Sequence, residues 1–266
     1  MPREYTYGPF QSRRLGLSLG VNVLANYKLC TYNCVYCEIG LTKKEHLVSP
    51  IQRIKLPPSI NFRKELISIL NYFPHLDSIT FGYNGEPTLN DNLLDFLKIA
   101  VDVRNNLNLI PKTPKLTLFT NSSTLYIDEI RERVKNFELI LAKLDAGNDD
   151  DFKRTNRPHN ETPNIEIIIN SLIKLKQEMP KENKLAIQCL IYNSYIKDFI
   201  TNNNSKNITD IAIALKKIKP DIVQIYSTAR IPAEYFVFSI DDERKREIAG
   251  IFRDVITDDK IEISIY

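Results

Sequence analysis

Short apolar runs alternate with longer amphipathic stretches along most of the chain. Six of the runs predict strands, at residues 19–24, 78–83, 115–120, 139–145, 184–192 and 221–227. Between them, apolar residues recur every three or four positions, which is the spacing of a helix with one buried face. This pattern predicts helices at 62–73, 92–107, 125–137, 164–179 and 209–219, followed by a helix at 241–256 and a strand at 261–266.

Six strand–helix units in series predict a parallel sheet with right-handed crossovers, and hence a barrel or a doubly wound α/β sheet. The sequence shows neither an internal repeat nor a stretch of linker-like composition. We therefore expect residues 1–240 to form one core, with the helix and strand of 241–266 packed on it. The low-complexity stretch TNNNSKN at 201–207 predicts an exposed loop.

Polar residues follow several of the predicted strands, at the position where parallel α/β proteins bind their ligands. Because the carboxyl ends of parallel strands meet at one rim, we expect these residues to lie together. They are the cysteine cluster after the first strand, Asn84, Gly85 and Glu86 after the second, Thr120 and Asn121 after the third, and Asp145 after the fourth.

The composition of the 266-residue chain is that of an ordinary globular protein, with 43% hydrophobic and 26% charged residues. A net charge of +3 is too small to argue for nucleic-acid binding by itself. No apolar run approaches the roughly 20 residues that span a bilayer, and the N-terminus lacks the apolar core of a signal peptide. These features predict a cytoplasmic protein without membrane contact, where clustered cysteines are metal-binding or catalytic rather than disulfide-bonded.

Three of the four cysteines lie within eight positions, at Cys30, Cys34 and Cys37. An iron–sulfur cubane takes one thiolate per iron, so three cysteines leave one iron open. An open coordination position is typical of a catalytic metal. A zinc site would require a fourth ligand from Cys189, distant in sequence, or from one of three histidines. Zinc and chance spacing remain the alternatives at this point.

The cysteine spacing, with Tyr36 before the third cysteine, resembles the signature of the radical S-adenosylmethionine superfamily. YNGEPTL at 83–89 resembles the second-strand motif of that superfamily, and FTNSS at 119–123 resembles its third-strand element. The resemblance implies a (β/α)6 partial TIM barrel that binds a 4Fe–4S cluster and S-adenosylmethionine. In the superfamily, one electron from the cluster cleaves S-adenosylmethionine, and the resulting 5′-deoxyadenosyl radical removes a hydrogen atom from the substrate.

The same resemblance implies roles for individual residues. Cys30, Cys34 and Cys37 would bind the cluster, and Glu86 would receive the ammonium of the cofactor. Thr120 and Asn121 suit helix capping equally well. Apart from the resemblance, Lys143 and Asp145 lie at alternate positions of a strand and therefore point the same way. Pointing outward they would be a solvated pair, but we expect them to point inward, because Leu144 between them then packs under the helices. The implied cofactor-binding residues are Tyr36, Asn84, Gly85, Glu86, Pro87, Thr120, Asn121 and Asp145, and the catalytic candidates are Lys143, Asp145 and Arg230.

Within the superfamily, the chain resembles the wyosine-synthase-like iron–sulfur oxidoreductases from Tyr7 to about Glu234. Arginines in the matching segments suit an anionic ligand such as phosphate, or they are merely solubilising. No cysteine precedes Cys30, so the chain lacks the thiolates of the second cluster that the wyosine enzyme carries. It also lacks a flavodoxin-like domain, which predicts a separate electron donor of the ferredoxin or flavodoxin type.

The leading interpretation is therefore a radical S-adenosylmethionine enzyme. Its substrate is unidentified, and the resemblance suggests a modified nucleoside or transfer RNA. One alternative is an activating enzyme that installs a radical on a protein partner. Another is a non-catalytic metal-binding module.

Overall fold

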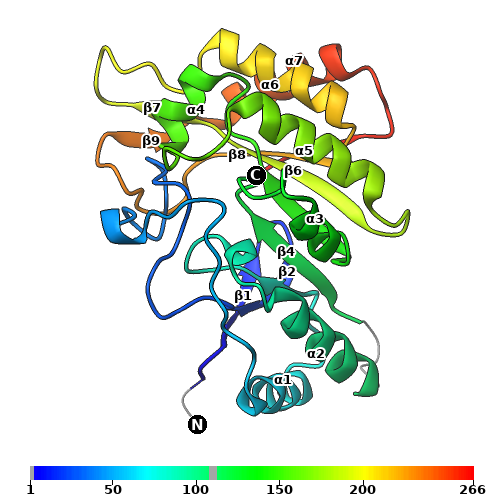
Figure 1. Ribbon diagram of the computed structural model, residues 1–266. Helices are drawn as coiled ribbons and strands as arrows, with labels where there is room; N and C mark the ends of the chain where they lie inside the picture. The colour runs from blue at the N-terminus through cyan, green and yellow to red at the C-terminus, as the bar shows by residue number, and fades with distance from the viewer. Residues whose placement is uncertain (1–2, 108–112) are drawn as a thin grey trace.

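The computed structural model describes residues 3–107 and 113–266 and is built on an eight-stranded sheet (Figure 1). Strand β1 (Thr6–Ser12) pairs antiparallel with β2 (Gly16–Val21), and all the other neighbours in the sheet are parallel. The order continues through β3 (Ser78–Phe81), β4 (Lys115–Thr120), β5 (Leu139–Lys143), β6 (Lys184–Leu190), β8 (Ile222–Tyr226) and β10 (Glu262–Ile265). A separate antiparallel pair is formed by β7 (Tyr192–Ser194) and β9 (Val237–Ser239).

The helices lie along the outer side of the curved sheet, where α5, α6 and α7 pack side by side and α1 packs on α2 (Figure 1). Their apolar faces and the outward side chains of the strands form the main core, which includes the fully buried Phe62, Phe81 and Phe96. The helices are α1 (Ile60–Tyr72), α2 (Leu93–Asn106), α3 (Asp128–Val134), α4 (Asp149–Asn156), α5 (Ile165–Glu178), α6 (Ser205–Ile218) and α7 (Asp242–Ile256), with short 3-10 turns η1 (Lys44–His46) and η2 (Pro87–Leu89).

The fold class predicted from the sequence is confirmed. All six predicted parallel strands form, in the predicted order, and a helix follows β3, β4, β5 and β6 on the way to the next strand. The C-terminal strand β10 pairs with β8 in parallel and so extends the same sheet, while α7 packs against it. The division of the chain at residue 240 stays a prediction.

Four helices and strands were missing from the prediction: β1, α4, β7 and β9. Strand β1 is an edge strand with few buried side chains, so its hydrophobic pattern is weak. Helix α4 begins with three aspartates, and Phe152 is its one apolar residue, so it lacks an apolar periodicity. The β7–β9 pair has only three residues per strand, too few for a recognisable alternation.

The prediction of an exposed loop at 201–207 was wrong. Asn202 and Asn207 are fully buried, and α6 already begins at Ser205, with the Asn204 side chain accepting a hydrogen bond at its N-terminus. Asparagine amides donate and accept, so they pair buried backbone groups that would otherwise be unsatisfied. In residues 3–107 and 113–266, no helix has the length and apolar character needed to cross a bilayer.

Candidate functional site

The three clustered cysteines lie on the cysteine loop, residues 22–59, which follows β2 and crosses the carboxyl ends of the parallel strands. Cys30 is buried, Cys34 and Cys37 are partly exposed, and all three are free thiols. Two successive turns of the backbone follow Cys34, closed by hydrogen bonds from Cys37 N to Cys34 O (3.2 Å) and from Gly40 N to Cys37 O (3.1 Å). The fourth cysteine, Cys189, is buried in the main core and lies outside this loop.

Each of the three sulfur atoms accepts a hydrogen bond from a different side chain. Asn121 Nδ2 lies 3.4 Å from the Sγ of Cys30, and Asn156 Nδ2 lies 3.5 Å from the Sγ of Cys34. Lys28 Nζ lies 3.2 Å from the Sγ of Cys37. Donors of this kind stabilise a ligand sulfur in its negatively charged form.

Burial favours the protonated form of the Cys30 and Cys34 thiols by raising the pKa of each. It raises the pKa of Cys30 to about 12, with a further contribution from the neighbouring Cys34. It likewise raises the pKa of Cys34 to about 11, with Cys37 adding to the effect. A metal that takes these sulfurs as thiolates must therefore displace protons and supply the compensating positive charge.

The turn after β3 is hydrogen-bonded to the cysteine loop immediately before Cys30. Leu29 N donates to Asn84 O at 2.7 Å, and Glu86 N donates to Leu29 O at 3.0 Å. Gly85 has a φ of +129°, and a Cβ there would stand 1.7 Å from the Leu29 carbonyl oxygen. Only glycine allows this close approach. The Asn84 side chain adds a bond to Ala25 O at 3.0 Å.

The Glu86 carboxylate is 1% exposed and is satisfied by protein donors on both oxygens. Its Oε1 accepts hydrogen bonds from the backbone N–H and the hydroxyl of Thr88 (3.2 and 2.6 Å) and from the hydroxyl of Thr120 (2.8 Å). Its Oε2 accepts from Asn121 N at 2.6 Å. Burial raises the pKa of Glu86, and these hydrogen bonds oppose the rise. Glu86 therefore joins η2, which begins at the buried Pro87, to the end of β4.

On the β5 side, Asp145 connects the sheet to the cysteine loop. Its Oδ2 accepts hydrogen bonds from the Tyr36 hydroxyl and from Asn156 Nδ2 (3.1 Å). Its Oδ1 accepts from Leu190 N at 2.8 Å and lies 3.5 Å from Lys143 Nζ. Tyr36 and Asn156 thus bring the cysteine loop and α4 to the same carboxylate.

Lys143 and Asp145 point the same way into this site, while Leu144 between them lies in the main core. Lys143 Nζ donates to the Tyr226 hydroxyl at 2.7 Å and stands 4.5 Å from the centre of the Tyr36 ring. Burial opposes the charge on Lys143, but Asp145 and Tyr226 outweigh it and raise the pKa of the lysine. Lys143 is therefore a cation held close to the cysteines.

The structure does not bring Arg230 into this group. Its side chain is exposed and forms an ion pair with Glu38, also exposed, at 3.0 Å. Arg154 and Arg157 are likewise paired, with Asp151 and Glu234. Arg14 differs, because its guanidinium lies 4.4 Å from the centre of the Tyr226 ring and one of its nitrogens is buried without a hydrogen-bond partner.

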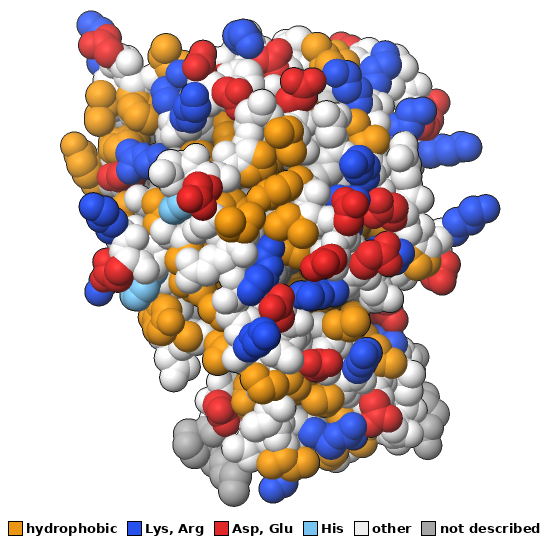
Figure 2. Space-filling model, viewed as in Figure 1, with side chains coloured by type: hydrophobic (Ala, Val, Ile, Leu, Met, Phe, Trp, Pro, Cys, Tyr) orange, Lys and Arg blue, Asp and Glu red, His pale blue; other side chains and the backbone are white. Residues whose placement is uncertain are grey.

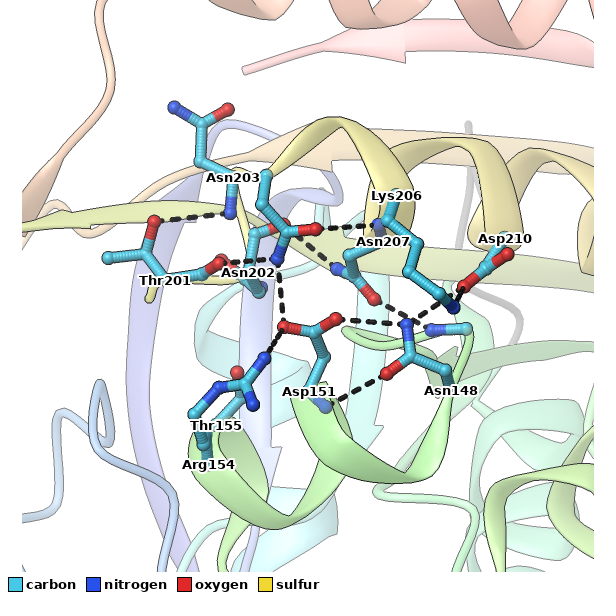
Figure 3. A network of polar contacts seen from close by, with 12 residues as sticks. Asn148, Asp151, Arg154, Thr155, Thr201, Asn202, Asn203, Lys206, Asn207 and Asp210 are labelled. Atoms are coloured by element: carbon cyan, nitrogen blue, oxygen red, sulfur yellow. Dashed lines mark hydrogen bonds and ion pairs between the residues drawn. The ribbon is translucent and has the colours of Figure 1, made fainter. Parts of the chain in front are cut away.

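A network of asparagine side chains, including Asn148, Asn202 and Asn207, connects the start of α4 with the start of α6 (Figure 3). Asn202 Nδ2 donates to the carbonyl oxygens of Asp145 (3.0 Å) and Leu190 (2.7 Å). Asn207 Nδ2 donates to Asn202 O at 2.8 Å, and Asn207 Oδ1 accepts from Gly147 N at 2.9 Å. The start of α6 is in this way fastened to the segment that leads from β5 into α4.

Sequence reasoning missed several residues of the site: Lys28, Asn156, Asn202, Asn207 and Tyr226. Lys28 and Asn156 carried a usable signal, since Lys28 lies two residues before Cys30 and Asn156 lies within the stretch from Tyr7 to Glu234 that resembles the wyosine-synthase-like group. The buried asparagines carried the opposite signal, because polar low-complexity composition predicts exposure.

The metal group that the three thiols could bind depends on how their sulfur atoms are arranged. Within the part of the chain that the structure describes, no three Cys, His, Asp or Glu side chains converge as the ligands of one metal ion would. A cubane is bound one thiolate per iron, so its cysteines surround the cluster rather than converging on one point.

No family model matches the chain. Solved structures with the same fold are radical S-adenosylmethionine enzymes, and the chain has the fold of that class. SuiB of Streptococcus suis, solved with S-adenosylmethionine bound, gives a TM-score of 0.59 at 12% identity, over 92% of this chain and 50% of that one. TYW1, solved with a lysine–pyruvate adduct, gives a TM-score of 0.56 at 15% identity, over 89% of this chain and 73% of the other.

The sequence relatives name a family. A UPF0026 protein of Synechocystis is 31% identical over 84% of this chain and 75% of its own length. A UPF0026 protein of Methanocaldococcus jannaschii is 29% identical over 97% of this chain and 74% of its own length. The chain belongs to the UPF0026 family. A protein of Brachyspira hyodysenteriae named GTPase Obg is 31% identical over 92% of this chain, which spans only 33% of that protein.

Proposed function

We propose that this protein is a radical S-adenosylmethionine enzyme in which Cys30, Cys34 and Cys37 hold a 4Fe–4S cluster. When bound, the cluster supplies the electron that cleaves S-adenosylmethionine to a 5′-deoxyadenosyl radical. The observation that carries the proposal is the set of three free thiols, each with its own N–H donor, at the carboxyl ends of a partial barrel. Three thiolates leave one iron of the cubane for the cofactor.

Other residues of this chain would position the cysteine loop and bind the cofactor. The Gly85 turn and the Asn121 segment dock the cysteine loop on β3 and β4, and Asp145 docks it on β5 through Tyr36. Backbone groups of 84–87, together with Thr120 and Asn121, are the proposed contacts for the methionine end of the cofactor. Lys143 supplies a fixed positive charge beside the cysteines, which suits a carboxylate of cofactor or substrate.

The proposal includes an external one-electron donor of the ferredoxin or flavodoxin type and a core of residues 1–240 with an appended C-terminal helix and strand. The resemblance to the wyosine-synthase-like group, supported by the common fold with TYW1, makes a nucleoside or RNA substrate one candidate. Lys and Arg side chains are interspersed with Asp and Glu over the face seen in Figure 2, which does not favour a broad RNA-binding surface there.

A peptide or protein substrate is the second candidate, and one observation favours it. The β7–β9 pair follows the carboxyl ends of β6 and β8 and packs on Val35 and Tyr36 of the cysteine loop. Near this pair, Tyr195, Ile231 and Tyr235 are 73%, 89% and 84% exposed. Exposed apolar side chains beside a catalytic mouth are typical of a surface that contacts another macromolecule.

The test needs no knowledge of the substrate. The protein is reconstituted with iron and sulfide without oxygen and incubated with dithionite and S-adenosylmethionine, and 5′-deoxyadenosine is measured. We expect about four irons per chain and continuous production of 5′-deoxyadenosine. Cys34→Ala abolishes both, while Cys189→Ala leaves both intact. Equal activity in Cys34→Ala, or a wild-type protein that binds zinc and no cluster, contradicts the proposal.

A further inference from the structure

Lys28 is the one charged side chain among the three that donate to the cysteine sulfurs, the other two being the amides of Asn121 and Asn156. Its ammonium lies 3.2 Å from the Sγ of Cys37. It also donates to the carbonyl oxygen of Gly40 and so spans the turn that contains Cys37. The lysine is half-buried, so solvent screens its charge only in part.

The donors to the other two sulfur atoms are uncharged. Asn121 and Asn156 each hold their sulfur with a neutral dipole.

We infer that Lys28 sets the reduction potential of the cluster. The inference rests on the proposed function, because it takes the cluster to be bound by these cysteines. Reduction adds one electron to the cluster and its thiolates, and a cation in contact with a ligand sulfur stabilises the reduced form more than the oxidised form. Lys28 thus makes the cluster easier for an external donor to reduce. It is a positioning residue, since it acts through Cys37.

Three substitutions separate charge from hydrogen bonding. Lys28→Arg keeps the charge and the donors, Lys28→Gln keeps a donor without charge, and Lys28→Met removes both at similar length. Lys44→Met is the matched control, because Lys44 lies exposed on the same loop and its loss changes the net charge equally. Each reconstituted protein is titrated potentiometrically with dithionite, and the reduced cluster is quantified by electron paramagnetic resonance.

In Lys28→Met, the ratio of reduced to oxidised cluster at a fixed potential should fall at least tenfold, which is 59 mV for a one-electron couple. Lys28→Gln should follow Lys28→Met, while Lys28→Arg and Lys44→Met should stay within threefold of wild type. A Lys28→Met midpoint equal to that of wild type overturns the inference. So does a wild-type midpoint in Lys28→Gln, since the charge would then be irrelevant.

Cluster content distinguishes this inference from the proposed function. A wild-type protein that binds no iron and gives no paramagnetic signal refutes the proposed function. Wild-type protein with a full cluster, together with unshifted variants, refutes the role of Lys28 alone. If both uncharged variants lose the cluster while Lys28→Arg retains it, Lys28 is needed for assembly, and its assignment to the potential is overturned.

Discussion

Two buried acidic residues are hydrogen-bonded to the cysteine loop from opposite sides, Glu86 through its backbone N–H and Asp145 through its carboxylate, and the two carboxylates have different partners. Glu86, on the β3–β4 side, is surrounded by neutral donors: two threonine hydroxyls and two backbone N–H groups. Asp145, on the β5–β6 side, lies 3.5 Å from the ammonium of Lys143 and bonds directly to Tyr36 of the cysteine loop. Both carboxylates therefore have both oxygens occupied by protein groups, and the difference is that only Asp145 has a cation among its partners.

The largest expected effect lies on the Glu86 side, at Gly85. Gly85→Ala places a Cβ 1.7 Å from the Leu29 carbonyl and must push the cysteine loop off its turn. We expect most of the bound iron to be lost and the free energy of unfolding to fall by roughly 3 kcal/mol or more. Iron analysis and urea unfolding measure the two effects.

Gly40→Ala is the control for Gly85→Ala. Gly40 also has a positive φ, +84°, but a Cβ there meets nothing within 4 Å. Its substitution should cost only about 1 kcal/mol, the strain of the backbone conformation, and leave the iron content unchanged. Equal damage from both substitutions would mean that backbone strain, and not the contact with Leu29, makes Gly85 necessary.

The second prediction tests whether the Glu86 carboxylate stabilises the fold by joining η2 to the end of β4. Glu86→Ala leaves the donors of Thr88, Thr120 and Asn121 without their acceptor, and we expect a loss of about 2–4 kcal/mol in the free energy of unfolding. Glu86→Gln, which keeps one acceptor oxygen, should lose less. If Glu86→Ala unfolds like wild type but binds S-adenosylmethionine more weakly in calorimetry, the result would instead support a direct contact between Glu86 and the methionine ammonium.

The third prediction concerns the Asp145 side. Asp145→Asn leaves the partly buried Lys143 without its anionic partner, and Lys143→Met leaves the buried carboxylate without its cation. In a double-mutant cycle on the metal-free protein, the two losses should not add, and the coupling should be about 1–3 kcal/mol. A coupling near zero would mean that the ion pair with Lys143 does not contribute to the stability conferred by Asp145.

The smallest expected effect is the pH dependence of the free energy of unfolding that arises from Glu86. Its folded-state pKa lies above the usual 4.5, chiefly because of burial, so the unfolded chain ionises first as the pH rises. Wild type should therefore exceed Glu86→Gln in the free energy of unfolding by the largest amount below pH 4.5. This difference should shrink as the pH rises through the folded-state pKa of Glu86. Urea unfolding of both metal-free proteins, from below pH 4.5 to neutral, measures this difference. A difference that grows with pH would mean that hydrogen bonding outweighs burial.

The sequence predicted the scaffold of this protein because the relevant signals are local. The apolar run 115–120 and the periodic stretch 164–179 each record the burial of one element, and both form within a residue or two of the prediction. The cysteine spacing and the order of strands likewise placed the candidate site at the carboxyl ends of the sheet. Strand alternation predicted that Lys143 and Asp145 point the same way, and the apolar Leu144 between them favoured the inward direction.

Tertiary structure alone decided how the site is held. The donors to Cys30 and Cys34 come from residues 91 and 122 positions away, and Tyr36 meets Asp145 across 109 positions. Such contacts depend on how loops dock after the strands assemble, which periodicity does not encode. For the same reason, the asparagines of 201–207 had the composition of an exposed loop, although their amides are buried on backbone groups that only the folded chain brings to them.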